Sequence, residues 1–323
     1  MYFNSNNNFF HGIMFHHFHD NGVHKKGQGS ISKDEFYKMI NFIGRENILD
    51  ADIFFEKFKK NKLKENEVCL TFDDVVKCQI DIALPILEEL KIKSFFFAYT
   101  SVFEGKPDNL EVFRYFRMNY FDNIEEFYNS FYKVLDKDLK TFFEDNNEKI
   151  KSNKKKFPHY SIEDIKFRLV RDVFLTNNQY QEKMFLMIKE KQFHYKDFYA
   201  KLFFQKDDLI RLDSLGHLVG LHSHSHPTLI EKLNYDEQKN EYVKCLSSIS
   251  KILKKPKNEI KYMAHPCGSY NKDTLEILQE LGIELGFKQI MTTDPEMGMK
   301  KVNNSFLEIA RQDHAEIFKR MNS

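Results

Sequence analysis

The stretch VCLTFDDVVKCQIDIALPILEELKIKSFFFAY, residues 68–99, decides the fold class. It opens with a short apolar, β-prone run (68–72) that ends on two adjacent aspartates. Apolar residues then recur at helical spacing over 82–90, and the phenylalanine-rich run 94–99 is typical of a buried strand. A strand, a helix and a second strand at this spacing indicate a βαβ unit and therefore a parallel sheet.

The same rhythm continues on both sides of this unit. Toward the N-terminus, residues 12–19 predict a short strand, and Ser32 precedes a helix with apolar positions at helical spacing. Toward the C-terminus we predict helices at 207–215, 236–253 and 273–281, and strands at 217–222, 260–264, 284–287 and 306–310. This alternation predicts an α/β fold, a distorted (β/α) barrel of about seven strands with its chemistry at the C-terminal strand ends.

Residues 105–205 interrupt this alternation of strands and helices. Their sequence predicts several helices, one with an apolar stripe over 124–135. We interpret them as a helical insertion within a single barrel domain, 1–323. As an oversized βα loop it would rise over the C-terminal face and shape the substrate pocket. A dimerisation element is the alternative. Lys154–Lys156 are interpreted as a solvated loop, or as a cationic patch leaning toward a phosphate.

The composition excludes several classes of protein. Lys and Arg number 49 against 48 Asp and Glu, and this balance argues against a dedicated nucleic-acid binder. No apolar run approaches the roughly 20 residues of a membrane-spanning helix. The cysteines form no CxxC pair, and the N-terminus lacks the pattern of a signal peptide. We therefore expect a cytoplasmic protein with free thiols; the sequence leaves its oligomeric state open.

Two groups of polar residues follow predicted strands. The first is Thr71-Phe72-Asp73-Asp74, and the second is His222-Ser223-His224-Ser225-His226-Pro227. One helical turn would place the imidazoles of His222 and His226 on the same face. Two neutral imidazoles and one carboxylate suit Zn²⁺ or a similar divalent ion, and a second carboxylate can take a proton from bound water. Either group alone is a weak signal, but their joint occurrence after β-strands favours a metal-assisted hydrolase.

These residues carry a resemblance to a known family. T-F-D-D and H-[ST]-x-x-H are the first two motifs of the NodB-homology polysaccharide deacetylases, carbohydrate esterase family four, which the chain resembles. The similarity extends over LGHLVGLHSHSHPTL, YMAHPCGSYNKDTLEILQELGIELGF, GIMFHHF and FLEIAR, and so over most of the chain outside the insertion. The chain is most similar to a subclass with an F-A-Y-P-Y-G-like motif, in which the catalytic histidine comes from an N-terminal strand.

The resemblance implies a role for each matching residue. Asp73 would be the general base, and Asp74, His222 and His226 would be the metal ligands. Ser223 would steady the loop, and the Cys267 backbone N–H would help to hold the oxyanion. His16, with His17 as the alternative, would be the catalytic acid.

The sequence also departs from the family pattern. Val75 replaces the usual glycine after T-F-D-D, and the stretch 264–268 lacks the arginine and the aromatic residue that many members carry. Arg311, after a late predicted strand, can supply the missing guanidinium. His217 is interpreted as structural rather than as a ligand, and His224 as a residue that supports the ligand residues without binding the metal itself.

Together these expectations describe a metal-dependent N-deacetylase. The cofactor would be a divalent metal, Zn²⁺ in preference to Co²⁺, Ni²⁺ or Mn²⁺. The substrate would be an N-acetylated amino sugar, nucleotide- or lipid-linked, in O-antigen (lipopolysaccharide) or other surface-glycan biosynthesis. The alternatives are a catalytically impaired sugar-binding protein of the same fold and another C–N hydrolase such as a deformylase. A pure binder would not need both Asp73 and Asp74.

Overall fold

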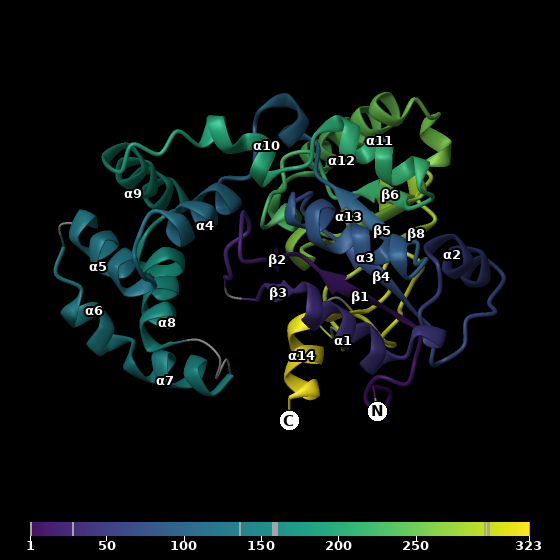
Figure 1. The fold of residues 1–323 in the computed structure, drawn as a ribbon, viewed down its shortest axis with the longest axis horizontal. Helices are drawn as coiled ribbons and strands as arrows, with labels where there is room; N and C mark the ends of the chain where they lie inside the picture. Colours follow the sequence, from purple (N-terminus) through teal and green to yellow (C-terminus); the bar gives the residue numbers. More distant parts are fainter. Residues whose placement is uncertain are drawn as a thin grey trace. The chain divides into compact units, whose positions relative to one another are not determined.

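One sheet of parallel strands forms the centre of the larger compact unit, Met1–Asp108 with Ala200–Ser323 (Figure 1). The structure is a computed structural model that describes residues 2–27, 29–135, 137–156, 161–293, 295 and 298–322. Within those ranges the sheet has seven strands: β1 (His11–Phe15), β4 (Val68–Phe72), β5 (Phe95–Ala98), β6 (Leu218–Leu221), β7 (Tyr262–Ala264), β8 (Leu285–Phe287) and β9 (Arg311–Asp313). They lie in the order β8-β7-β6-β5-β4-β1-β9. A parallel bridge from Phe287 to Ile309 links β8 to the segment before β9, so the sheet closes into the predicted, nearly complete barrel.

Two predicted strands differ from the observed ones. The predicted strand 12–19 is two strands, because β1 ends at Phe15 and β2 (Phe18–His19) pairs instead with β3 (Ile31–Ser32). The predicted strand 306–310 is wrong. The regular strand is β9, which begins at Arg311 and pairs with β1. Its polar sequence, Arg-Gln-Asp, carries no hydrophobic signal, because Arg311 is buried through ion pairing rather than through apolar packing.

The predicted barrel helices are present with small changes in their ends. They are α1 (Lys33–Ile43), α3 (Leu84–Glu89), α11 (Lys206–Ser214), α12 (Tyr235–Leu253) and α13 (Lys272–Glu280). Two further helices, α2 (Ala51–Lys59) and α14 (His314–Met321), were not predicted. Ser32 caps α1 through a reciprocal pair of hydrogen bonds with Glu35, which explains why the chain becomes helical there. Before α3 the chain makes a wider π-helical turn, η2 (Gln79–Ala83). No helix in the described ranges has the length and apolarity needed to cross a bilayer.

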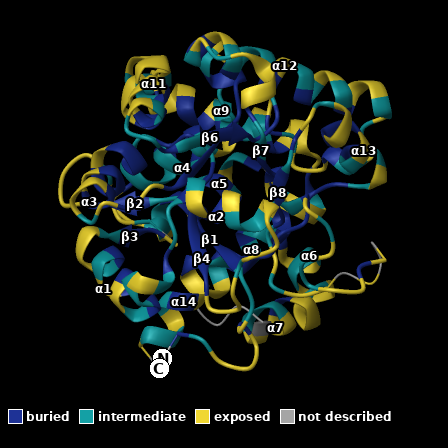
Figure 2. Ribbon diagram, turned by 90° about the vertical axis from the view of Figure 1, so that its right-hand side faces the viewer, coloured by how far each residue is buried: buried dark blue, intermediate teal, exposed yellow. Residues whose placement is uncertain are grey.

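Aromatic side chains pack on both faces of the sheet, because consecutive strand residues such as Phe95 and Phe96 point to opposite faces. Phe72 and Phe96 stack with ring centroids 4.7 Å apart, and Phe95 and Phe287 lie 5.3 Å apart. In Figure 2 the strands are dark blue, that is buried, while the exposed yellow residues lie mainly on the surrounding helices and loops. Gly12 on β1 is needed for a close approach, because a Cβ there would lie 3.0 Å from Cγ of Arg311.

A second compact unit, Asn109–Tyr199, contains α4 (Asn109–Asn119), α5 (Ile124–Leu135), α6 (Lys140–Asp145), α7 (Asn147–Lys156), α8 (Ile162–Leu169) and α9 (Asn177–Glu190). The aromatic stripe of α5 is core, since Phe127 and Phe131 are fully buried against Phe167. The solvated loop predicted at Lys154–Lys156 is instead the end of α7. Lysine and glutamate are good helix formers, and an ion pair between Glu148 and Lys151 supports this polar helix.

Candidate active site and metal centre

Strand ends bring the predicted site residues together. Asp73 and Asp74 follow β4, His222 follows β6, and His16 follows β1. In a parallel β/α barrel these C-terminal ends share one face, which is where such folds carry their chemistry.

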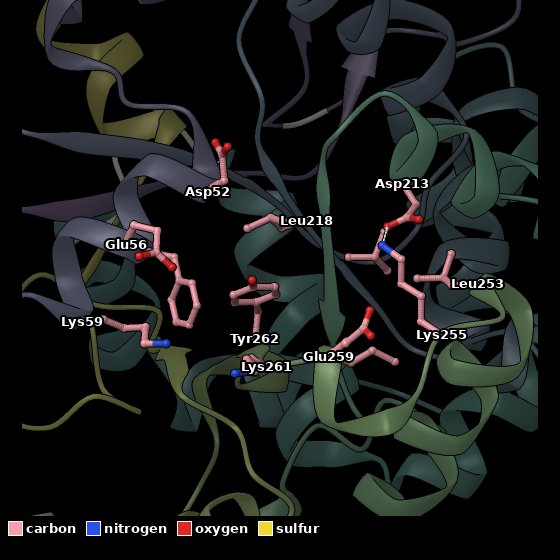
Figure 3. Close-up of a pocket in the computed structure, with 13 residues that line it drawn as sticks. Asp52, Glu56, Lys59, Asp213, Leu218, Leu253, Lys255, Glu259, Lys261 and Tyr262 are labelled. Carbon is pink, nitrogen blue, oxygen red and sulfur yellow. Dashed lines mark hydrogen bonds and ion pairs between the residues drawn. The ribbon is translucent and has the colours of Figure 1, made fainter.

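A cavity of about 340 Å³ lies at the opposite ends of β6 and β7 (Figure 3). Leu218 and Tyr262, the first residues of those strands, line it together with ion-paired side chains such as Lys255 and Asp213. None of the predicted site residues is among the lining residues that the structure describes there. The face opposite the C-terminal strand ends usually contributes stability rather than chemistry.

Asp74, His222 and His226 form a compact group of potential metal ligands. Oδ1 of Asp74 lies 3.2 Å from Nε2 of His222 and 3.3 Å from Nε2 of His226. One ligand atom from each residue lies within 4.8 Å of the other two. His222 and His226 are both buried.

The hydrogen bonds of the two imidazoles suit a cation at this point. Nδ1 of His222 donates to the carbonyl of Ala264 at 2.8 Å, and Nδ1 of His226 donates to Oδ2 of Asp108 at 2.9 Å. In the neutral rings both Nε2 lone pairs therefore face Oδ1 of Asp74, a buried atom with no hydrogen-bond partner among the described residues. Three electron-pair donors directed at one another need a positive charge between them, so this donor set fits a divalent metal.

The pKa shifts follow the same arrangement. Burial opposes ionisation of Asp74, but His226 and His222 hold the pKa of its carboxyl well below the usual value. Burial alone would lower the pKa of His226, yet Asp74 and Asp108 raise it well above that of a free imidazole.

The loop from His222 to His226 is not the predicted helical turn. Ser223 and His226 have φ values of 63° and 57°, in the left-handed region. The imidazoles nevertheless converge, because the loop folds back on itself and the His226 N–H donates to Ser223 Oγ at 3.1 Å. Residue spacing correctly paired the two histidines, but the helical geometry assumed for them was wrong.

Residues distant in sequence anchor this loop, and sequence analysis missed them. Glu241 on α12 accepts hydrogen bonds from the N–H groups of His224 and Ser225, at 3.0 and 2.7 Å. The carbonyl of His224 accepts from the N–H groups of Thr100 and Ser101, and its side chain bonds to Thr100 Oγ1. These contacts agree with the interpretation of His224 as a supporting residue. The only sequence signal for Glu241 is its place on an amphipathic helix, which is shared by many glutamates.

Asp73 lies beside the ligand group with a fixed partner. Nη1 of Arg311 donates to its Oδ1 at 2.8 Å, while Nε of Arg311 donates to the carbonyl of Lys288 at 3.0 Å. Both side chains are nearly fully buried. Burial raises the pKa of Asp73, but the Arg311 guanidinium together with His222 and His16 outweighs burial, and the pKa is lowered. Asp73 is therefore an oriented carboxylate at neutral pH.

His16 completes the group. Its Nε2 lies 3.8 Å from Oδ2 of Asp73 and 3.8 Å from Oδ2 of Asp74, and its side chain is 21% exposed. Gln79, fully buried in the π-helical turn η2, donates from Nε2 to the backbone carbonyls of His16 and Asp73 at 2.9 and 2.6 Å. Gln79 thus fastens the segments that carry these two residues. It was missed, because no motif marks it.

Two further predicted residues lie in unusual backbone. Cys267 has φ 52°, and desolvation raises the pKa of its thiol to about 11, which disfavours a thiolate nucleophile. Val75, where glycine is usual, has φ 49° although it is β-branched and buried. His217, outside the site, accepts the Ser94 N–H at Nδ1 (3.0 Å), in agreement with its structural interpretation.

Comparison with known proteins identifies the family. The polysaccharide deacetylase family model matches residues 60–286. No curated protein sequence matches the chain. Three solved structures are similar in fold at low identity. Streptococcus pyogenes deacetylase PplD in complex with acetate has a TM-score of 0.54 and 16% identity, with 94% of this chain and 91% of that one covered. A de-N-acetylase from Aggregatibacter actinomycetemcomitans and IcaB from Ammonifex degensii each have a TM-score of 0.52, 12% identity and 94% of this chain covered, with 93% and 91% of their own chains covered. The chain, with its parallel β/α barrel, belongs to the polysaccharide deacetylase family.

Proposed function

We propose that this protein is a metal-dependent hydrolase that removes the N-acetyl group from an amino sugar. The observation that carries the proposal is the convergence of Asp74, His222 and His226 on one point, beside an Asp73 carboxylate oriented by Arg311. A divalent ion held by the three ligands, Zn²⁺ in preference to Co²⁺, Ni²⁺ or Mn²⁺, would polarise the acetamide carbonyl and make water easier to deprotonate.

The chain's own residues then have complementary tasks. Asp73 takes a proton from the attacking water. Arg311 keeps the Asp73 carboxylate ionised and correctly oriented for this step. His16 gives a proton to the nitrogen of the leaving amine when the C–N bond breaks. The Cys267 N–H donates to the developing oxyanion. The products are acetate and a free amino sugar.

We place the substrate among nucleotide- or lipid-linked sugars of surface-glycan biosynthesis, such as O-antigen, in the cytoplasm. The likeness to structures described as a deacetylase with acetate and as a de-N-acetylase supports the reaction type. The Arg311–Asp73 pair disfavours a protein that only binds sugar, since binding needs no oriented base.

The test is acetate release from zinc-loaded protein. The substrates are N-acetylated nucleotide sugars, lipid-linked sugars and oligosaccharides, with formate measured in parallel. We expect acetate, metal-dependent turnover and no activity in Asp73→Asn. Formate alone would indicate a deformylase. Neither product from metal-loaded protein would contradict the proposal.

A further inference from the structure

We propose that Asp108 is the positioning residue of the metal ligand His226. Its carboxylate holds the imidazole with hydrogen on Nδ1 and with Nε2 turned toward Asp74. The inference rests on the proposed metal-dependent function and extends it to a residue outside both sequence motifs.

The contact is short and largely shielded from water. Oδ2 of Asp108 lies 2.9 Å from Nδ1 of His226, and the two side chains are 19% and 7% exposed. A carboxylate oxygen accepts a hydrogen bond from an imidazole N–H, so this contact places the hydrogen on Nδ1. Nε2 is then the nitrogen left to bind a metal, and it is the nitrogen that lies 3.3 Å from Oδ1 of Asp74.

Asp108 is itself held in place. Its backbone N–H donates to the hydroxyl of Tyr99 at 3.1 Å, and Tyr99, directly after β5, is 1% exposed. The rings of Tyr99 and His226 lie 5.4 Å apart. The barrel therefore fixes the Asp108 backbone through one contact, while its side chain is engaged with His226. Backbone support and imidazole orientation can be separated by mutation.

The second imidazole ligand is oriented differently. His222 donates from Nδ1 to a backbone carbonyl, that of Ala264, which no side-chain substitution removes. A carboxylate behind a ligating imidazole fixes its tautomer and increases its strength as a ligand, and loss of such a partner commonly costs about 10–100-fold in metal affinity. Asp108 is the partner that performs this role for His226.

The experiment compares zinc affinity in wild type, Asp108→Asn and Asp108→Ala, by competition with a chelator on the full-length chain. We expect about 10–100-fold weaker binding for Asp108→Ala. Asp108→Asn should lose less, because its amide oxygen still accepts from Nδ1. Asp81→Asn is the matched control, since Asp81 makes a similar 2.8 Å contact with His24 outside the site.

Imidazole ¹⁵N NMR of the zinc-free protein, recorded at a pH above the raised pKa of His226 so that the ring is neutral, supplies a second readout. Asp108→Ala should shift His226 toward the Nε2–H tautomer, whereas Tyr99→Phe, which removes the hydroxyl that accepts from the Asp108 N–H but keeps the ring beside His226, should not. Unchanged zinc affinity and tautomer in folded Asp108→Ala, or in Asp108→Leu, which also lacks an acceptor, if the alanine variant does not fold, would overturn the inference alone. A wild type that binds no divalent metal would overturn the proposed function as well.

Discussion

Arg311 on β9 and Asp73 after β4 form a buried ion pair, with Nη1 donating to Oδ1 at 2.8 Å. Arg311 is also tied to Lys288, so its guanidinium cannot rotate freely. One strand of the barrel thereby orients a carboxylate on another. This pair places an ionised acceptor next to the group formed by Asp74, His222 and His226.

Replacing Arg311 with lysine should impair Asp73 through both geometry and pKa. Lysine keeps the positive charge, but it lacks the planar guanidinium that donates to the Asp73 carboxylate and the Lys288 carbonyl at the same time. Because Arg311 lowers the pKa of Asp73, a weaker partner should raise that pKa and move the acid limb of the kcat/KM profile to higher pH. We expect a rate loss of about tenfold or more. Arg211→Lys, at an exposed pair with Glu88, is the control. An unmoved acid limb would contradict the assigned role.

Asp73→Asn should retain the metal and lose activity. The amide cannot accept the proton of the attacking water, and a positioned base contributes about 10²–10⁴-fold. Metal content and single-turnover rates measured on the same preparation check this. Asp74→Asn should behave differently, by losing the metal. If Asp73→Asn keeps its activity, another group is the base.

His226→Ala should remove most of the bound metal. A ligand that binds only the folded state raises the melting temperature, so a chelator should lower the Tm of wild type and leave that of His226→Ala almost unchanged. His194→Ala is the control, because it removes an exposed imidazole that does not belong to the ligand group. Equal metal content in wild type and His226→Ala would refute the ligand assignment.

His217 should make the fold sensitive to acid. Burial, with help from Lys93, lowers its pKa from 6.5 to about 4. Between pH 6.5 and about 4, His217 is protonated in the unfolded chain but not in the folded chain. The contribution of this residue to the free energy of unfolding is therefore fully present above pH 6.5 and is lost as the pH drops toward 4. Between pH 7 and pH 5 the loss from this group is about 2 kcal/mol. Urea unfolding should show a smaller loss in His217→Gln, and no such change in His194→Gln, which alters an exposed histidine. Identical pH dependence in His217→Gln would contradict this origin.

Gly12→Ala should disturb the candidate active site by displacing Arg311. The added Cβ would meet Cγ of Arg311 at 3.0 Å and the Phe287 ring at 3.2 Å. Overpacking of this kind costs about 1–3 kcal/mol, and movement of Arg311 would also lower activity. Gly22→Ala, which has only ordinary contacts, is the comparison for both unfolding and rate. A fully active and stable Gly12→Ala variant would contradict this prediction, because it would show that the Arg311 side chain accommodates the added methyl group.

The sequence by itself determined the parts of this protein that depend on local pattern. The strand Val68–Phe72 is a continuous apolar run and appears as predicted, and Ser32 with Glu35 marks the start of α1. Periodicity of this kind is visible because each residue is buried or capped by near neighbours. The alternation of such elements was enough to predict the barrel.

The tertiary structure alone decided which polar residues meet. β9 has no apolar pattern, because its first residue is buried by pairing with a carboxylate 238 positions away. The loop from His222 to His226 takes left-handed conformations that spacing does not reveal. Asp108 lies 118 positions from His226 and belongs to no motif. Hydrogen bonds and ion pairs between distant segments depend on how the chain folds in space, so local sequence carries no periodic trace of them.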